Sequence, residues 1–132
     1  MKGSERGSVA RMPPTLAPGK VCYLQIPARD PARAADFYAS VFGWTIRRDA
    51  DGRIAFDDTV GEVSGTWVSD RAPAEQPGLL VYILVESVER ALERIVAAGG
   101  EVVVPLTPQG PGEAFATFRD PDGNVLGVGQ QP

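Results

Sequence analysis

The side chains that most often do chemistry in proteins are scarce in this chain. Its 132 residues contain no histidine and one cysteine, so a Ser/His/Asp triad, an intrachain disulfide and a cysteine-rich metal site are all excluded. Cys22, between Val21 and Tyr23, is typical of a small buried apolar residue rather than a reactive thiol. Asp120 and Asp122 resemble a carboxylate pair for acid–base catalysis, but within Asp-Pro-Asp-Gly they are typical turn residues. The polar candidates that remain are tyrosines and a glutamine.

Composition and charge exclude several kinds of partner. Lysine and arginine number 13 against 17 acidic residues, which gives a net charge of −4 and a pI near 4.8. Because these basic residues are scattered, the sequence predicts neither nucleic-acid nor anionic-membrane binding. No stretch approaches the roughly twenty apolar residues of a membrane span. We expect a cytoplasmic protein with a disordered leader over residues 1–19 and a single domain over 20–132.

The first half of the domain reads as one strand, one helix and three strands. Residues 21–26 are rich in strand-forming side chains, and Asp30-Pro31 is a helix start in which the carboxylate caps free amides. Gly43 follows the apolar helical stripe and predicts its end. The stripe consists of Ala34, Phe37, Tyr38, Val41 and Phe42. Strands are predicted at 44–48, 53–56 and 63–68, followed by a linker at 69–78.

The second half repeats this order. A strand at 79–85 precedes a helix that is capped by Ser87 and ends at Gly99-Gly100, with further strands at 101–106, 114–119 and 125–129 and a loop at 108–112. A shift of 57 positions superposes the halves. It aligns Arg33 with Arg90, Ala34 with Ala91 and Gly43 with Gly100. We interpret the chain as an internal repeat with modules at 20–69 and 79–130.

Three segments then carry a resemblance to a known family: IPARDPARAADFYASVFGW at 26–44, AAGGEVVVPLTP at 97–108 and FATFRDPDGNVLGV at 115–128. In this order they resemble the vicinal oxygen chelate superfamily of glyoxalases, bleomycin-resistance proteins and dioxygenases. The chain looks most similar to the compact branch related to lactoylglutathione lyase. The resemblance implies an α+β fold in which two tandem βαβββ modules form a curved eight-stranded sheet around one cavity.

The resemblance also implies four metal-ligand positions in that cavity, usually His or Glu. They fall on Tyr23, Leu80, Gly127 and a position near Gly65. None of these is a usual ligand, and a divalent site needs at least three N, O or S donors. We therefore predict no metal and no cofactor, so Lewis-acid and ferrous-iron chemistry of the family's kind is not expected.

Strand alternation predicts which side chains line the cavity. Cys22, Leu24, Ile26, Leu79, Val81, Ile83 and Val85 should pack on the helices. Tyr23, Gln25, Trp67, Leu80, Tyr82 and Leu84 should face the cavity, whose floor Gly65 and Gly127 should enlarge. An alternative stays open, in which the tyrosines and the tryptophan simply fill the core.

The remaining charged residues indicate ordinary surface positions. Arg29, Arg47, Arg48 and Arg53 are interpreted as exposed arginines at strand ends rather than an anion-attracting rim, and Asp57 and Asp58 as a solvated edge.

Three classes of function remain. The first is a metal-free protein that binds a small aromatic or hydrophobic molecule through Tyr23, Gln25, Trp67, Leu80, Tyr82 and Gly127. The second is an enzyme related to lactoylglutathione lyase that uses Tyr23 or Tyr82 as a proton donor or holds an atypical metal site. The third is a structural subunit without a ligand. The resemblance implies a homodimer, with any ligand at the interface.

Overall fold

The computed structural model describes residues 14–132, so most of the predicted leader lies outside the described residues. Each module contains one helix and four strands. The first consists of β2 (Tyr23–Pro27), α1 (Pro31–Phe42), β3 (Thr45–Arg48), β4 (Ile54–Asp57) and β5 (Ser64–Val68). The second consists of β6 (Tyr82–Leu84), α2 (Val88–Ala97), β7 (Glu101–Gly110), β8 (Glu113–Arg119) and β9 (Val125–Gln130). None of the helices in the described part has the length and apolarity that crossing a membrane requires.

The strands form two four-stranded sheets with the same topology, ordered β2-β5-β4-β3 and β6-β9-β8-β7. In each sheet the first strand of the module pairs in parallel with the last, and the other pairs are antiparallel. The predicted α+β class and the two tandem βαβββ modules are confirmed. The hydrogen bonds join the eight strands as two separate sheets rather than one continuous sheet.

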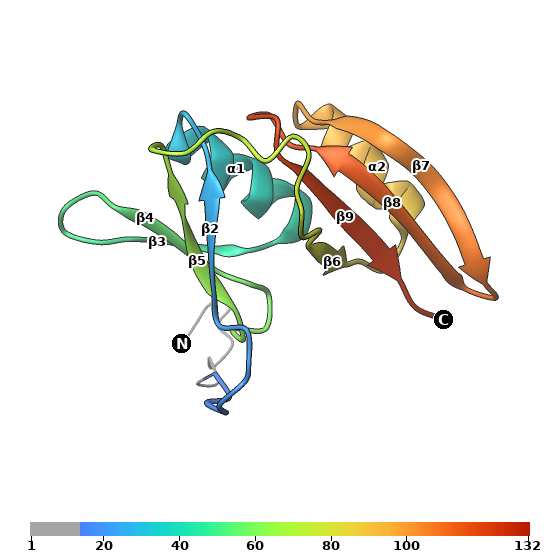
Figure 1. Ribbon diagram of the computed structural model, residues 1–132, viewed down its shortest axis with the longest axis horizontal. Helices are drawn as coiled ribbons and strands as arrows, with labels where there is room; N and C mark the ends of the chain where they lie inside the picture. Colours follow the sequence, from blue (N-terminus) through green and yellow to red (C-terminus); the bar gives the residue numbers. More distant parts are fainter. Residues whose placement is uncertain (1–13) are drawn as a thin grey trace.

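Both helices begin and end where their capping residues predict. The Asp30 carboxylate accepts from the amides of Ala32 and Arg33, and Gly43 closes α1 in the left-handed conformation, with φ 75°. Ser87 caps α2 by accepting from the Arg90 amide. Figure 1 shows α1 in the middle of the molecule, between the two sheets, and α2 against one face of the second sheet.

The core is an aromatic cluster built mostly by the first module. The Tyr38 ring of α1 stacks on Trp44 at 4.8 Å between centroids, and Trp44 in turn stacks on Phe56 at 4.4 Å. Phe118 of β8 joins from the second module, because its ring lies 6.2 Å from that of Phe37. The two modules therefore share one core, with α1 contributing to both halves.

The Asp-Pro-Asp-Gly turn also ties the modules together. Asp120 accepts a hydrogen bond from the Tyr38 hydroxyl of α1 at 2.8 Å, and Asp122 accepts from the backbone amide of Arg29 at 3.0 Å. The Asn124 amide donates to the Pro27 carbonyl and accepts from the Ala74 amide, both at 2.7 Å. The turn predicted from the sequence is present, and it also connects the second module to β2, α1 and the linker.

Burial shifts the pKa values of the two side chains that form the Tyr38–Asp120 hydrogen bond. Desolvation, with a smaller contribution from Asp120, raises the pKa of Tyr38 well above its ordinary value, so the phenol remains the donor. Burial also raises the pKa of Asp120, although the bonds it accepts from Asn124 and Tyr38 oppose that shift.

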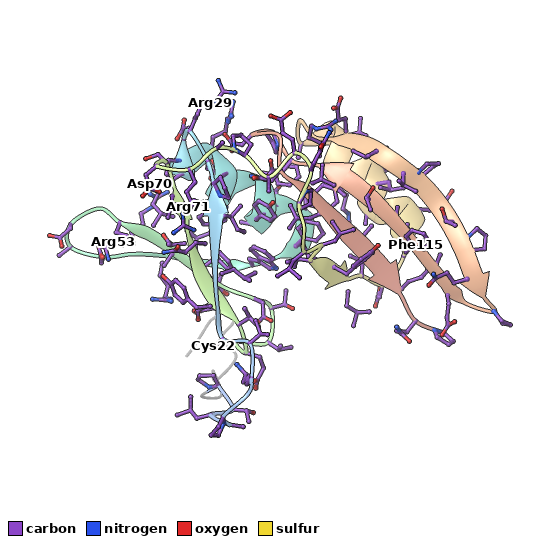
Figure 2. All side chains as sticks on the ribbon, viewed as in Figure 1. Cys22, Arg29, Arg53, Asp70, Arg71 and Phe115 are labelled. Carbon is purple, nitrogen blue, oxygen red and sulfur yellow. The ribbon has the colours of Figure 1, made fainter. Side chains whose placement is uncertain are left out.

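The ends of several strands differ from the prediction. Strand β6 begins only at Tyr82, so Leu79 and Val81 do not pack on α2, and Leu79 is 88% exposed. Strand β7 continues to Gly110, through the predicted loop. Cys22 precedes β2 and is exposed, so its interpretation as a buried apolar residue is wrong. Figure 2 shows it at the lower end of the first sheet.

Candidate functional site

Each sheet turns one face toward the helices and one face away from them, and we call the second the outer face. In β2, Ile26 is buried and Leu24 packs against the core, whereas Tyr23 and Gln25 lie on the outer face and are exposed. Tyr23 is 51% exposed. The predicted orientation of Tyr23 and Gln25 away from the helix is therefore confirmed, while their contact with a ligand stays a prediction.

The outer face of the second sheet carries an aromatic hollow. The rings of Tyr82 and Phe115 meet edge to face, with centroids 6.3 Å apart. A cavity of about 490 Å³ lies over them, and its lining includes Tyr82, Leu84, Gln109, Glu113, Phe115 and Gln131. Tyr82 is 49% exposed and Leu84 is 71% exposed. Figure 2 places Phe115 on the sheet of the second module. We call this feature the aromatic hollow.

Gly127 does not enlarge the space beside it as predicted. Gly127 pairs with Tyr82 across β9 and β6, and the Tyr82 ring lies so close over it that a Cβ at position 127 would overlap the ring. The space that the glycine leaves is therefore occupied by the tyrosine. Gly129, two residues further along β9, is open, since a Cβ there would approach nothing nearer than the Ala114 carbonyl at 3.9 Å.

Trp67 and Gly65 face the helix side, contrary to the predicted cavity lining. The register pairs Trp67 with Ile26 and Gly65 with Leu24, both on the helix-facing side. Trp67 is buried and its ring lies 4.9 Å from that of Phe56, so for this residue the core-filling alternative is correct. A Cβ at Gly65 would overlap both the Phe56 ring and the Leu24 carbonyl, so the glycine makes room for the core.

The register identifies the first-module counterpart of Gly127. Tyr82 pairs with Gly127, and its repeat partner Gln25 pairs with Thr66. The matching position is thus Thr66, one residue beyond the predicted one. The shift of 57 positions does not reach this pair, because β7 and β8 have 10 and 7 residues whereas β3 and β4 have 4 each, so the last strand comes later in the second module.

The outer face of the first sheet is polar. Asp57 lies at the end of β4 and is buried, and it accepts from Arg47 Nε at 2.9 Å and from the Ser64 hydroxyl at 2.7 Å. The hydrogen bond to Asp57 raises the pKa of Arg47. Both residues were interpreted as ordinary surface charges, and for Asp57 that interpretation is wrong. The alternation of buried Ile54 and Phe56 with Ala55 and Asp57 was the signal that placed Asp57 on this face.

The residues at the four implied ligand positions do not fit a divalent metal. They supply one phenol at Tyr23, an alkyl chain at Leu80, a hydroxyl at Thr66 and no side chain at Gly127, where the Tyr82 ring occupies the adjacent space. Within residues 14–132, no group of three or more His, Cys, Asp or Glu side chains is placed to hold a metal ion.

Comparisons with known proteins agree with this architecture. The family model of the Glyoxalase/Bleomycin resistance protein/Dioxygenase superfamily matches residues 20–128, and the chain belongs to this superfamily. A glyoxylase-like domain-containing protein of Didymella fabae is 30% identical over 125 residues, covering 86% of this chain and 95% of its own length. An anthracycline biosynthesis protein of Streptomyces peucetius is 27% identical over 86% of this chain, which spans only 47% of that relative.

A solved structure of a member of the same superfamily, from Sphaerobacter thermophilus, matches with a TM-score of 0.69 at 18% identity, covering 86% of this chain and 98% of that one. At this identity the match supports the fold alone.

Proposed function

We propose that the protein binds a small aromatic or hydrophobic molecule, without a metal, in the aromatic hollow. The observation that carries the proposal is the pair of partly exposed rings, Tyr82 and Phe115, beneath a cavity of about 490 Å³. Pockets of this size, lined by aromatic and aliphatic groups with a few polar side chains, are typical of small-molecule sites. The anthracycline biosynthesis relative supports a role connected with aromatic molecules.

We further propose that the chain acts as a homodimer whose partner covers this face. The large exposed apolar side chains of the second module are concentrated on β6, the residues that precede it, and β7. They are Leu79, Leu80, Val81, Tyr82, Leu84, Val102, Val103, Val104 and Leu106. Val102 pairs with the buried Phe118 and therefore belongs to the helix side, as does the exposed Val96 of α2. A surface this apolar is typical of an interaction site. This chain spans 47% of the Streptomyces relative, so two copies of the chain would together have about the length of that relative.

Titration of anthracene methanol, a neutral tricyclic fluorophore, tests the binding proposal. We expect saturable binding, and Phe115→Ala should weaken it about tenfold, because the substitution removes half of the aromatic pair. Val96→Ala is the matched control, since Val96 is an exposed apolar residue of α2, on the opposite side of the sheet. Absence of saturation, or equal weakening by both substitutions, would contradict the proposal.

An enzyme with an atypical site is the second candidate, and the polar outer face of the first sheet favours it. Arg47, Asp57 and Ser64 form a hydrogen-bonded group. The hydrogen bond to Asp57 contributes most to the raised pKa of Arg47, and the nearby Tyr23 makes the smallest contribution. Such a group could orient a polar substrate next to the Tyr23 phenol. Turnover of a bound compound that is lost in Tyr23→Phe but kept in Tyr82→Phe would favour this candidate over simple binding.

A further inference from the structure

The aromatic hollow is asymmetric in charge. Glu113 is the one residue with a formal charge among the described residues that line it, and the other polar side chains there are the Tyr82 phenol and glutamines such as Gln109 and Gln131. Within residues 14–132 the Glu113 carboxylate has no ion-pair partner. It is partly buried, and its Oε1 lies over Gly110 at the end of the β7–β8 hairpin, where a Cβ would come within 3.0 Å of it.

The carboxylate and one of the two rings lie on the same strand, β8, whereas Tyr82 lies on β6, on the other side of β9. Glu113 and Phe115 lie two positions apart on β8 and therefore on the same face, about 7 Å from each other along the strand. The faces of Tyr82 and Phe115 carry the negative part of the ring quadrupole, which attracts a cation and repels an anion. The rings and the carboxylate thus favour the same sign of ligand charge.

We propose that the ligand of the aromatic hollow is an aromatic cation, whose rings pack on Tyr82 and Phe115 and whose positive group, an amine or a protonated ring nitrogen, pairs with Glu113. This inference rests on the proposed function and names its ligand class. The net charge of −4 acts in the same direction at long range, since it raises the local concentration of cations around the molecule.

Three planar tricyclic probes of similar size separate the two proposals: proflavine, a cation at neutral pH, anthracene methanol, which is neutral, and anthracene carboxylate, an anion. We expect proflavine to bind about tenfold more tightly than the carboxylate at low salt, with the neutral probe in between. Raising the ionic strength should reduce the difference in affinity between proflavine and the carboxylate, because salt screens charge interactions. If none of the three probes binds, the proposed function itself fails. If all three bind equally, aromatic binding stands and the inference is overturned.

Substitutions at Glu113 test whether this residue causes the preference for a cationic over an anionic probe. Glu113→Gln should weaken proflavine binding about threefold to fivefold and leave anthracene methanol within about twofold, and Glu113→Lys should reverse the order of cation and anion. Glu93→Gln is the matched control, because it removes the same charge from an exposed position of α2 on the other side of the sheet. Circular dichroism confirms that each variant is folded. An unchanged charge preference in folded Glu113→Lys would overturn the inference.

Discussion

At the scale of the residue, two glycines show how much of a site depends on neighbouring rings. Gly65 and Gly127 were predicted from the sequence to enlarge the floor of a cavity, and neither leaves open space beside it. The sequence could not show that Phe56 fills the space at Gly65 and Tyr82 the space at Gly127. Which ring fills the space depends on the pairing register, because a shift of one residue turns every side chain of a strand to the other face of the sheet.

Alanine substitutions at three glycines should separate these roles. Gly65→Ala should destabilise the fold most, by about 3 kcal/mol or more, because its Cβ meets a backbone carbonyl and a buried ring. Gly127→Ala should cost about 1 kcal/mol, since the half-exposed Tyr82 ring can swing away. Gly129→Ala, on the same strand with open space, should be within about 0.5 kcal/mol of the wild type.

Urea unfolding of the three variants measures these differences. The binding of anthracene methanol provides a second readout, because the displaced Tyr82 ring should weaken binding in Gly127→Ala relative to the wild type. Equal stabilities for Gly65→Ala and Gly129→Ala would contradict the packing described for Gly65.

At the scale of the element, the sequence predicted helices better than strands, for a physical reason. The limits of α1 are set by local groups, the Asp30 carboxylate and Gly43, which act on the nearest backbone amides and carbonyls. Strand β6 has no such local signal. Leu79 to Val85 is a continuous apolar run, yet only Tyr82–Leu84 pair with β9 and form a strand. The length of a strand depends on its partner, which is distant in the sequence.

The turn between β8 and β9 carries the connection between modules, and Asn124→Ala tests it. The substitution removes the hydrogen bonds to Pro27 and Ala74 and a third, to Asp120 Oδ2, at 3.0 Å. Because Asn124 is almost fully buried, we expect a loss of about 2 to 4 kcal/mol in the free energy of unfolding. Gln76→Ala, in the exposed linker, should change it by less than about 0.5 kcal/mol. A similar small effect in Asn124→Ala would argue that the shared core alone holds the modules.

At the scale of the whole molecule, the repeat predicted the fold but not the relation between its two outer faces. Both modules have the same topology, yet one outer face carries Arg47, Asp57 and Ser64, and the other carries Tyr82 and Phe115. The sequence indicated aromatic residues on both. The polar group was missed in the sequence because charged residues in short strands look like ordinary surface residues. Only the pairing register shows that Arg47 and Asp57 lie on the same face and meet. In the proposed dimer, the polar face of one copy and the aromatic face of the other would together line one cavity.

The proposed dimer gives the last prediction. Leu84 is 71% exposed on the outer face of the second sheet, so in a monomer Leu84→Glu should barely change the free energy of unfolding. In a dimer that covers this face, the same substitution places a carboxylate in an apolar interface and should shift the native mass from dimer to monomer. Val96→Glu, at the exposed surface of α2, should leave the mass unchanged. Native mass spectrometry over a range of protein concentrations measures this. A wild-type monomer at every concentration, or a Leu84→Glu dimer as stable as the wild type, would show that the partner does not cover this face and that the aromatic hollow functions within one chain.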